Sequence, residues 1–435
     1  MLLLGVAAPR AHAQRSAETT LPLTLRAVLD SVRNTHPTIR AAESRLRAAE
    51  GSRVSARTIA NPTLAYQVDQ TPFPGAAPLP GLQREAMTTA TLPLEFLYQR
   101  GSKVARANAE VRAAQADAIA TRQRVALDAA AAFSRTGLAQ VQSTTTHDLL
   151  GWLDTLVVYN QSRVQEGAAA EADLIRSELE RDRVAAEAAM QDAELAQARA
   201  ALRALLTDGG NGAGSQVDVA IDDVPLAFPA RSTTGPTTGP TGPTGPTVTR
   251  PEVRAARERL DASNAAIAGE HSMLVRQVGV TIGTLQTAGT TSMIAGLSLP
   301  FPLFDQNRGE IQRATAERDA AAFELAGQER AATAELRGAY DAARILTDRA
   351  LILARHDSSS FLARADESRR IALGTYREGA VPLFQVIDAA RSWADARMTF
   401  YRTIAAQRQT VLSLLVAQGV DLFADTSIFN GSTLR

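Results

Sequence analysis

The chain offers few side chains that could do chemistry together. It has no cysteine, which excludes disulfides, thiolate metal sites and thiol nucleophiles. No two of its five histidines lie three or four residues apart, so a histidine metal site is not expected. These residues are His12, His36, His147, His271 and His356. No nucleophile elbow, phosphate-binding loop or dinucleotide fingerprint is evident. We therefore expect neither an enzyme nor a bound cofactor.

Two short motifs, each a glutamate followed by a glycine, are the strongest candidates for a functional site. Glu166-Gly167-Ala168 recurs as Glu378-Gly379-Ala380, an offset of 378 − 166 = 212. Glycine tolerates the positive φ that a turn between two helices needs. The glutamates could cap helices, stay at the surface or contact a partner. Asp173, six residues after the first glycine, could favour a helix N-terminus or narrow a channel.

The two motifs belong to a duplication of the whole chain. The segment that starts at His36-Pro37 matches the one that starts at Arg250-Pro251, an offset of 250 − 36 = 214. Leu92-Pro93 recurs at Leu299-Pro300, an offset of 299 − 92 = 207. We assign residues 14–210 to a first repeat and 249–424 to a second. Residues 211–248 form a linker rich in Gly, Pro and Thr, including Ser232–Pro246, and residues 425–435 form a tail.

Long helices should position the two motifs. No proline occurs between Pro93 and Pro225 or between Pro302 and Pro382, and proline destabilises a helix interior by roughly 3 kcal/mol. Ser102 to about Arg163 is rich in alanine, arginine, glutamate and glutamine, which all favour helices. The pattern predicts two helical hairpins: Ser102 to about Arg163 with Glu171–Leu206, and Asn307 to about Thr375 with Leu383–Ala417. An alanine stripe at helical spacing predicts close packing along the first long helix: Ala109, Ala113, Ala116 and Ala120.

Each repeat also contains two stretches in which apolar and polar residues alternate. They are Asn61–Asp69 and Glu85–Phe96, then Val278–Gly283 and Ser292–Leu299. Alternation predicts strands with one apolar face, and about ten residues is enough for a strand to cross a membrane. The polar face, with Asp69 and Glu95, would then line water. Gln70–Arg84 and Gln286–Thr291 would be loops. Two soluble hairpins packed on helices are the alternative.

Four strands cannot close a barrel, and lipid does not tolerate an open sheet edge. Two chains would give eight strands around a filled lumen, and three would give twelve strands around a channel. We therefore expect a homotrimer embedded in a membrane. The balance of 46 Lys+Arg against 46 Asp+Glu gives no reason to expect nucleic acid as a partner. Residues 1–13, apolar and ending in Ala-His-Ala, resemble a truncated signal peptide.

The duplicated order of a helix, a strand hairpin and a long helical hairpin resembles the TolC family of outer-membrane efflux channels. The segment Leu297–Gly309 resembles the strand-to-helix signature of the heavy-metal and RND branch. The resemblance implies a mainly α fold, in which a twelve-stranded trimeric barrel lies in outer-membrane lipid and continues into an α-helical tunnel that crosses the periplasm. It also implies a periplasmic membrane-fusion adaptor and an inner-membrane RND-type transporter as partners, and export of metal ions or drugs.

The resemblance implies an adaptor-docking tip at two places, with Glu166 and Gly167 at one and Tyr376, Glu378 and Gly379 at the other. It makes Asp173 a candidate periplasmic constriction. Val381 stands where the family often has arginine, so an ion-pair lock there is not implied. A conduit for protein secretion shares this fold and stays an alternative, and a soluble periplasmic adaptor is a weaker one.

Overall fold

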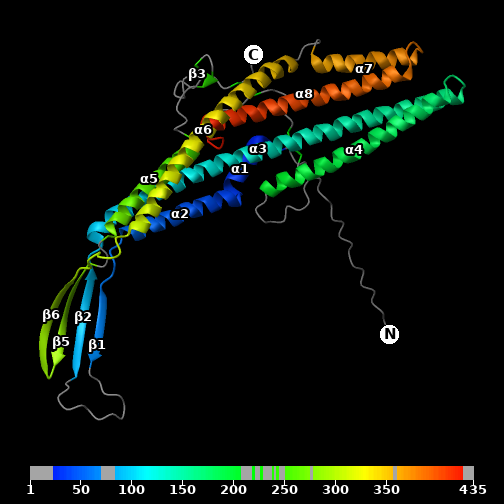
Figure 1. Ribbon diagram of the computed structural model, residues 1–435. Helices are drawn as coiled ribbons and strands as arrows, with labels where there is room; N and C mark the ends of the chain where they lie inside the picture. Colours follow the sequence, from blue (N-terminus) through cyan, green and yellow to red (C-terminus); the bar gives the residue numbers. More distant parts are fainter. Residues whose placement is uncertain are drawn as a thin grey trace, which may run out of the picture.

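The computed structural model describes residues 23–69, 84–206, 218–220, 226–228, 238–239, 242–243, 250–274, 278–355 and 360–424. The signal peptide and tail predicted for residues 1–13 and 425–435 lie outside these ranges, as do nearly all of Gln70–Arg84 and most of the linker. The described chain is elongated. A sheet occupies one end, and two turns between helices occupy the other (Figure 1).

Helices account for most of the described chain. The predicted first repeat holds α1 (Leu25–Thr35), α2 (Pro37–Arg57), α3 (Phe96–Gln165) and α4 (Glu171–Leu206). The second holds α5 (Pro251–Ser272), α6 (Arg308–Leu353), α7 (Phe361–Arg377) and α8 (Leu383–Ala417). The 70 residues of α3 span roughly 105 Å at the α-helical rise. Pro37 and Pro251 stand in the first turns of α2 and α5, as expected for matching positions in a duplication.

The second long helix is interrupted, and the prediction of one helix from Asn307 to about Thr375 is wrong. Helix α6 ends at Leu353, and α7 starts at Phe361. The Ser360 hydroxyl accepts a hydrogen bond from the Ala363 backbone N–H at 3.2 Å, which caps α7. Serine stabilises a helix start more than a helix interior, so this local signal favours a new helix over a continuous one.

The strands of both repeats form one antiparallel sheet. Its members are β1 (Thr63–Asp69), β2 (Glu85–Pro93), β5 (Gly279–Thr287) and β6 (Thr290–Ser298), in the order β1-β2-β5-β6 (Figure 1). The β2–β5 pair therefore joins the two repeats. The loop predicted at Gln286–Thr291 is instead a two-residue turn. Ala288 and Gly289 both have positive φ, 54° and 84°, as in a tight hairpin.

Small side chains let the helices approach closely. The predicted alanine stripe of α3 is buried, with exposed fractions of 2% for Ala109 and 0% for Ala116. Helix α3 packs against α2, α4, α5 and α8. Within the described ranges, no helix is both long and apolar enough to cross a membrane.

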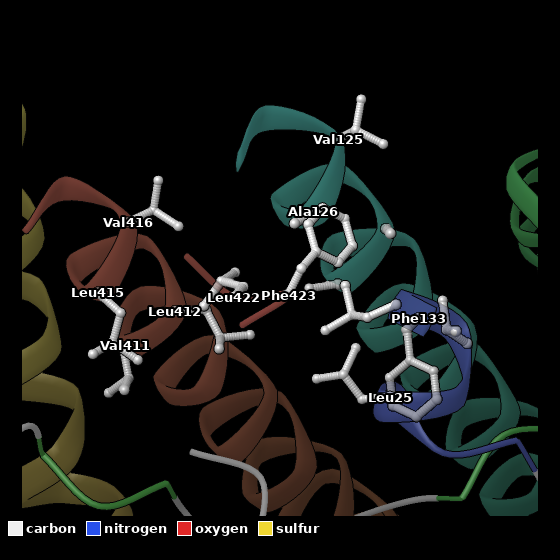
Figure 2. Close-up of a cluster of buried hydrophobic side chains, with 14 of the residues drawn as sticks. Leu25, Val125, Ala126, Phe133, Val411, Leu412, Leu415, Val416, Leu422 and Phe423 are labelled. Carbon is white, nitrogen blue, oxygen red and sulfur yellow. The ribbon is translucent and has the colours of Figure 1, made fainter. Parts of the chain in front are cut away.

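The main apolar core lies midway along the helices. It gathers α1, α3, the end of α8 and the turn that holds Leu422 and Phe423 (Figure 2). The part of the linker that precedes Ser232–Pro246 contributes to it. Val219 is 2% exposed and pairs with Leu23, and the Gln407 side chain hydrogen-bonds both backbone groups of Leu226. Further along the linker, β3 (Thr238–Gly239) pairs with β4 (Gly242–Pro243).

Candidate functional site

The pairing register gives the four-stranded sheet two chemically different faces. In an antiparallel sheet, residues directly opposite each other point to the same side. One side, here called the apolar face, is exposed along its length, with 78% of Leu64, 57% of Ile282 and 79% of Met293 accessible. It comprises Leu64, Tyr66, Val68, Ala86, Thr88, Ala90, Leu92, Val280, Ile282, Thr284, Gln286, Thr291, Met293, Ala295 and Leu297.

The opposite face is mainly threonine, serine, glycine and charged residues. Asp69 lies on it directly across from Glu85, and the Gln67 amide donates to both Asp69 carboxylate oxygens at 2.9 and 3.1 Å. The predicted strand to Phe96 ends earlier, at Pro93. Glu95 therefore lies outside the sheet. It is the residue before α3 and has helical φ and ψ of −58° and −26°.

Both edges of this sheet are unpaired within the described chain. β1 pairs only with β2, and β6 pairs only with β5. An edge strand presents a row of free N–H and C=O groups, and lipid supplies no partners for them. In lipid, a sheet with these two open edges would need strands from other chains.

At the far end, the two helix turns have the same geometry. Gly167 and Gly379 have φ of 72° and 76°. The Gly167 N–H bonds the Val164 carbonyl, and the Ala168 N–H bonds the Arg163 carbonyl. The second turn repeats this pattern, from Gly379 to Tyr376 and from Ala380 to Thr375. These are helix C-terminal motifs that require a left-handed residue. Glu166 and Glu378 are the exposed C-cap residues just before the glycines.

Behind the turns lies a polar cluster that joins the two hairpins. The Tyr376 side chain is 4% exposed, and its hydroxyl donates to the Asn160 amide oxygen at 2.7 Å. Tyr159 contacts the Tyr376 ring edge to face, and the Arg163 guanidinium lies 5.7 Å from both ring centroids. Burial raises the pKa of the Tyr376 hydroxyl above its usual range, while Arg163 acts to lower it and Asp173 to raise it. Asp173 lies in the first turn of α4, just after the Gly167 turn.

Sequence reasoning named Asp173 and Tyr376 but missed Asn160, Arg163 and one ion pair. The Arg391 guanidinium of α8 makes a bidentate ion pair with the Glu180 carboxylate of α4, with one contact at 2.7 Å. This hydrogen bond raises the pKa of Arg391. Glycine and tyrosine motifs signal the turns locally, whereas no local pattern links residues on different hairpins. Val381 packs, half-buried, against the apolar cluster that contains Tyr376.

The described residues contain no group of three or more His, Cys, Asp or Glu side chains arranged to hold a metal ion.

Residues 247–420 match the family model of outer membrane efflux proteins. The match covers most of the predicted second repeat. The similarity extends beyond the matched repeat, because the chain is 25% identical over 402 residues to a cobalt-zinc-cadmium resistance protein, CzcC, of Cupriavidus metallidurans. That alignment covers 90% of this chain and 89% of CzcC.

Solved structures of outer-membrane proteins share the fold. The outer membrane protein VceC of Vibrio cholerae is 19% identical and has a TM-score of 0.74, with 91% of this chain and 96% of VceC covered. The CmeC outer membrane channel of Campylobacter jejuni is 15% identical with a TM-score of 0.74, and the match covers 98% of this chain and 96% of CmeC. The predicted family resemblance and the predicted mainly helical fold with four strands are confirmed. The matched family and the relatives that share this fold are outer-membrane efflux and channel proteins, not enzymes.

Proposed function

We propose that three copies of this chain form one channel, in which their sheets build a twelve-stranded barrel that continues into a helical tunnel. The observation that carries the proposal is the single sheet with an exposed apolar face and two open edges. Joining β6 of one copy to β1 of the next removes every edge. Three copies give enough strands for a water-filled lumen, which two copies do not. Asp69 would line that lumen, and the apolar face would contact lipid.

The helices support the same kind of assembly. Helix α4 exposes Ile175, Leu179 and Met190, which are 57%, 70% and 65% accessible. At the other flank, α6 and α7 expose Ile345, Ile352 and Ile371, which are 61%, 54% and 54% accessible. The two apolar surfaces differ, so a contact between them joins unlike surfaces of neighbouring copies. Such contacts close into a ring when the rotation between copies is right.

The two turns are the proposed contact for a periplasmic adaptor. This adaptor would link the channel to an inner-membrane RND-type pump. Glu166, Gly167, Glu378 and Gly379 are exposed, as a docking surface requires. Tyr376 is buried, so its part in docking would be to hold the turn in place rather than to touch the adaptor. Asp173, beside this cluster, remains the proposed constriction.

The proposed cargo is small solutes, with metal ions the first to be tested. The support is the similarity to CzcC, which is named for cobalt, zinc and cadmium resistance. Fold alone does not decide cargo. A cell lacking its own channel component should regain metal export when this chain is supplied together with a matched pump and adaptor. Regained secretion of a protein substrate without metal export would favour the alternative conduit.

The assembly has a direct test. Native mass spectrometry of the chain in detergent should show a trimer, and the trimer should form pores in planar lipid bilayers. A stable monomer in detergent would contradict the proposed barrel, because its open edges would then be tolerated.

A further inference from the structure

The segment between β6 and α6 presents bulky apolar side chains to solvent. This segment, Leu299–Phe304, is here called the junction loop, and it lies where the sheet meets the helices. Phe301 and Leu303 are each 76% exposed, and Phe304 is 99% exposed. Exposed apolar patches of this kind mark surfaces that another molecule covers.

The junction loop is held in a defined shape, so the exposure belongs to the fold. The Leu303 N–H donates to the Phe301 carbonyl at 2.9 Å, and Pro300 and Pro302 restrict the backbone. Just beyond the loop, Asn307 is 3% exposed and left-handed, with φ 54°. Its side-chain amide donates to the backbone carbonyl and to the carboxylate of Glu270 on α5, both at 2.9 Å. The end of the loop nearest α6 is therefore anchored to its own protomer.

A second exposed apolar segment lies at the opposite edge of the same sheet. The chain from Val54 to Pro62, here called the α2 end, leads from α2 into β1. Val54 is 62% exposed and Ile59 is 50% exposed. The two segments cannot cover each other within one protomer. β1 and β6 are separated by β2 and β5, and three strand spacings amount to roughly 14 Å.

The topology brings these two segments together between copies. β6 runs toward the helices and ends at Ser298, and β1 starts at Thr63 and runs away from the helices (Figure 1). When the edge strands of neighbouring copies pair, the residues after β6 and the residues before β1 lie on the same level of adjacent strands. We propose that the junction loop of each protomer packs on the α2 end of the next. These contacts would form an apolar ring where the barrel meets the helices, here called the collar. This inference rests on the proposed trimer.

Charged neighbours favour a second copy over lipid as the occupant. Asp305 directly follows Phe304, and Arg57 stands two residues before Ile59. Placing these groups in hydrocarbon is unfavourable, whereas at a subunit boundary they can stay at the rim in water. The exposed apolar side chains on both segments then remove each other from water.

The natural absence of cysteine makes the contact easy to test. The full chain carrying Ile59→Cys and Phe304→Cys is assembled in detergent, confirmed as a trimer by native mass spectrometry, and treated with a short bismaleimide. We expect most of the monomer band on denaturing gels to shift to covalent dimer and trimer. The matched control is Leu97→Cys with Phe304→Cys. Leu97 is 69% exposed, but it follows the interior strand β2, so this pair should stay largely monomeric.

The outcomes separate this inference from the proposed function. A native trimer without the Ile59–Phe304 crosslink, or with equal crosslinking of the Leu97 control, would overturn the collar and leave the trimer standing. Absence of any trimer from the unmodified chain would overturn both. If the first double variant fails to assemble, Val54→Cys with Phe301→Cys tests the same contact, with the same expected shift and the same contradicting results.

Discussion

Gly283 allows the strands of the two repeats to pair, and replacing it should weaken the sheet. It lies in β5 opposite Thr89 of β2, the strand pair that joins the repeats. A Cβ atom at Gly283 would stand 2.2 Å from the Thr88 carbonyl oxygen and 2.8 Å from the Thr89 Cγ2 atom. Ordinary contacts are over an ångström longer than the first of these distances, so Gly283→Ala must push β5 away from β2.

The expected magnitude follows from that movement. Overpacking typically destabilises by about 1–3 kcal/mol, and one weakened ladder hydrogen bond adds about 1 kcal/mol. We expect Gly283→Ala to reduce the free energy of unfolding by roughly 2–4 kcal/mol per protomer. Gly296→Ala is the matched control, since Gly296 lies in the adjacent strand β6 on the same face, and a methyl group there would have nothing within 4 Å. It should be neutral or stabilise by about 0.4–1 kcal/mol.

The assay is thermal unfolding of the purified protein in detergent, followed by far-UV circular dichroism and by loss of the trimer on gels. Gly283→Ala should unfold at a clearly lower temperature than Gly296→Ala. Because the nearest atom is a backbone oxygen, adding Thr89→Ala should not restore stability. Equal unfolding temperatures for the two glycine variants, or full rescue by Thr89→Ala, would refute the steric reasoning.

Four further predictions concern the turns and the linker. Gly379→Glu should leave the trimer intact but weaken adaptor crosslinking and efflux. Gly374→Glu is the control, because Gly374 also has open space around it but lies in a helix, and this variant should keep normal crosslinking and efflux. Equal effects of the two variants would contradict a docking role for Gly379. Deleting Ser232–Pro246 should preserve the trimer in native mass spectrometry, while a deletion that also removes Leu226 should destabilise it by leaving Gln407 without those partners. Tyr376→Phe should speed hydrogen exchange at the second turn, because the buried Asn160 oxygen loses its donor, worth about 1–3 kcal/mol. In the wild type, the raised pKa of Tyr376 means that its contribution is fully present below about pH 10 and is lost as pH rises further, which tyrosinate absorbance can follow; a loss near neutral pH would contradict this.

The local patterns of the sequence determined the elements and their order. Period-two alternation located all four strands of the sheet, and the proline-free stretches located the helical hairpins. The bounds Glu171–Leu206 and Leu383–Ala417 agree with α4 and α8. Both turn glycines were identifiable because a positive φ restricts residue type at one position, whatever lies around it. Such signals depend on residues that are close together in the chain, so the sequence alone is enough to predict these elements.

Contacts between distant segments were decided only by tertiary structure. The start of α3 at Phe96 removed Glu95 from the sheet, although the alternation of apolar and polar residues continues through it. The Tyr376–Asn160 bond and the Glu180–Arg391 ion pair each join residues more than 200 positions apart. The packing of Val219 and Leu226 into the core likewise needed the helices that surround them. Periodicity specifies which face of an element is apolar, but which other element covers that face depends on how all the helices and strands pack together.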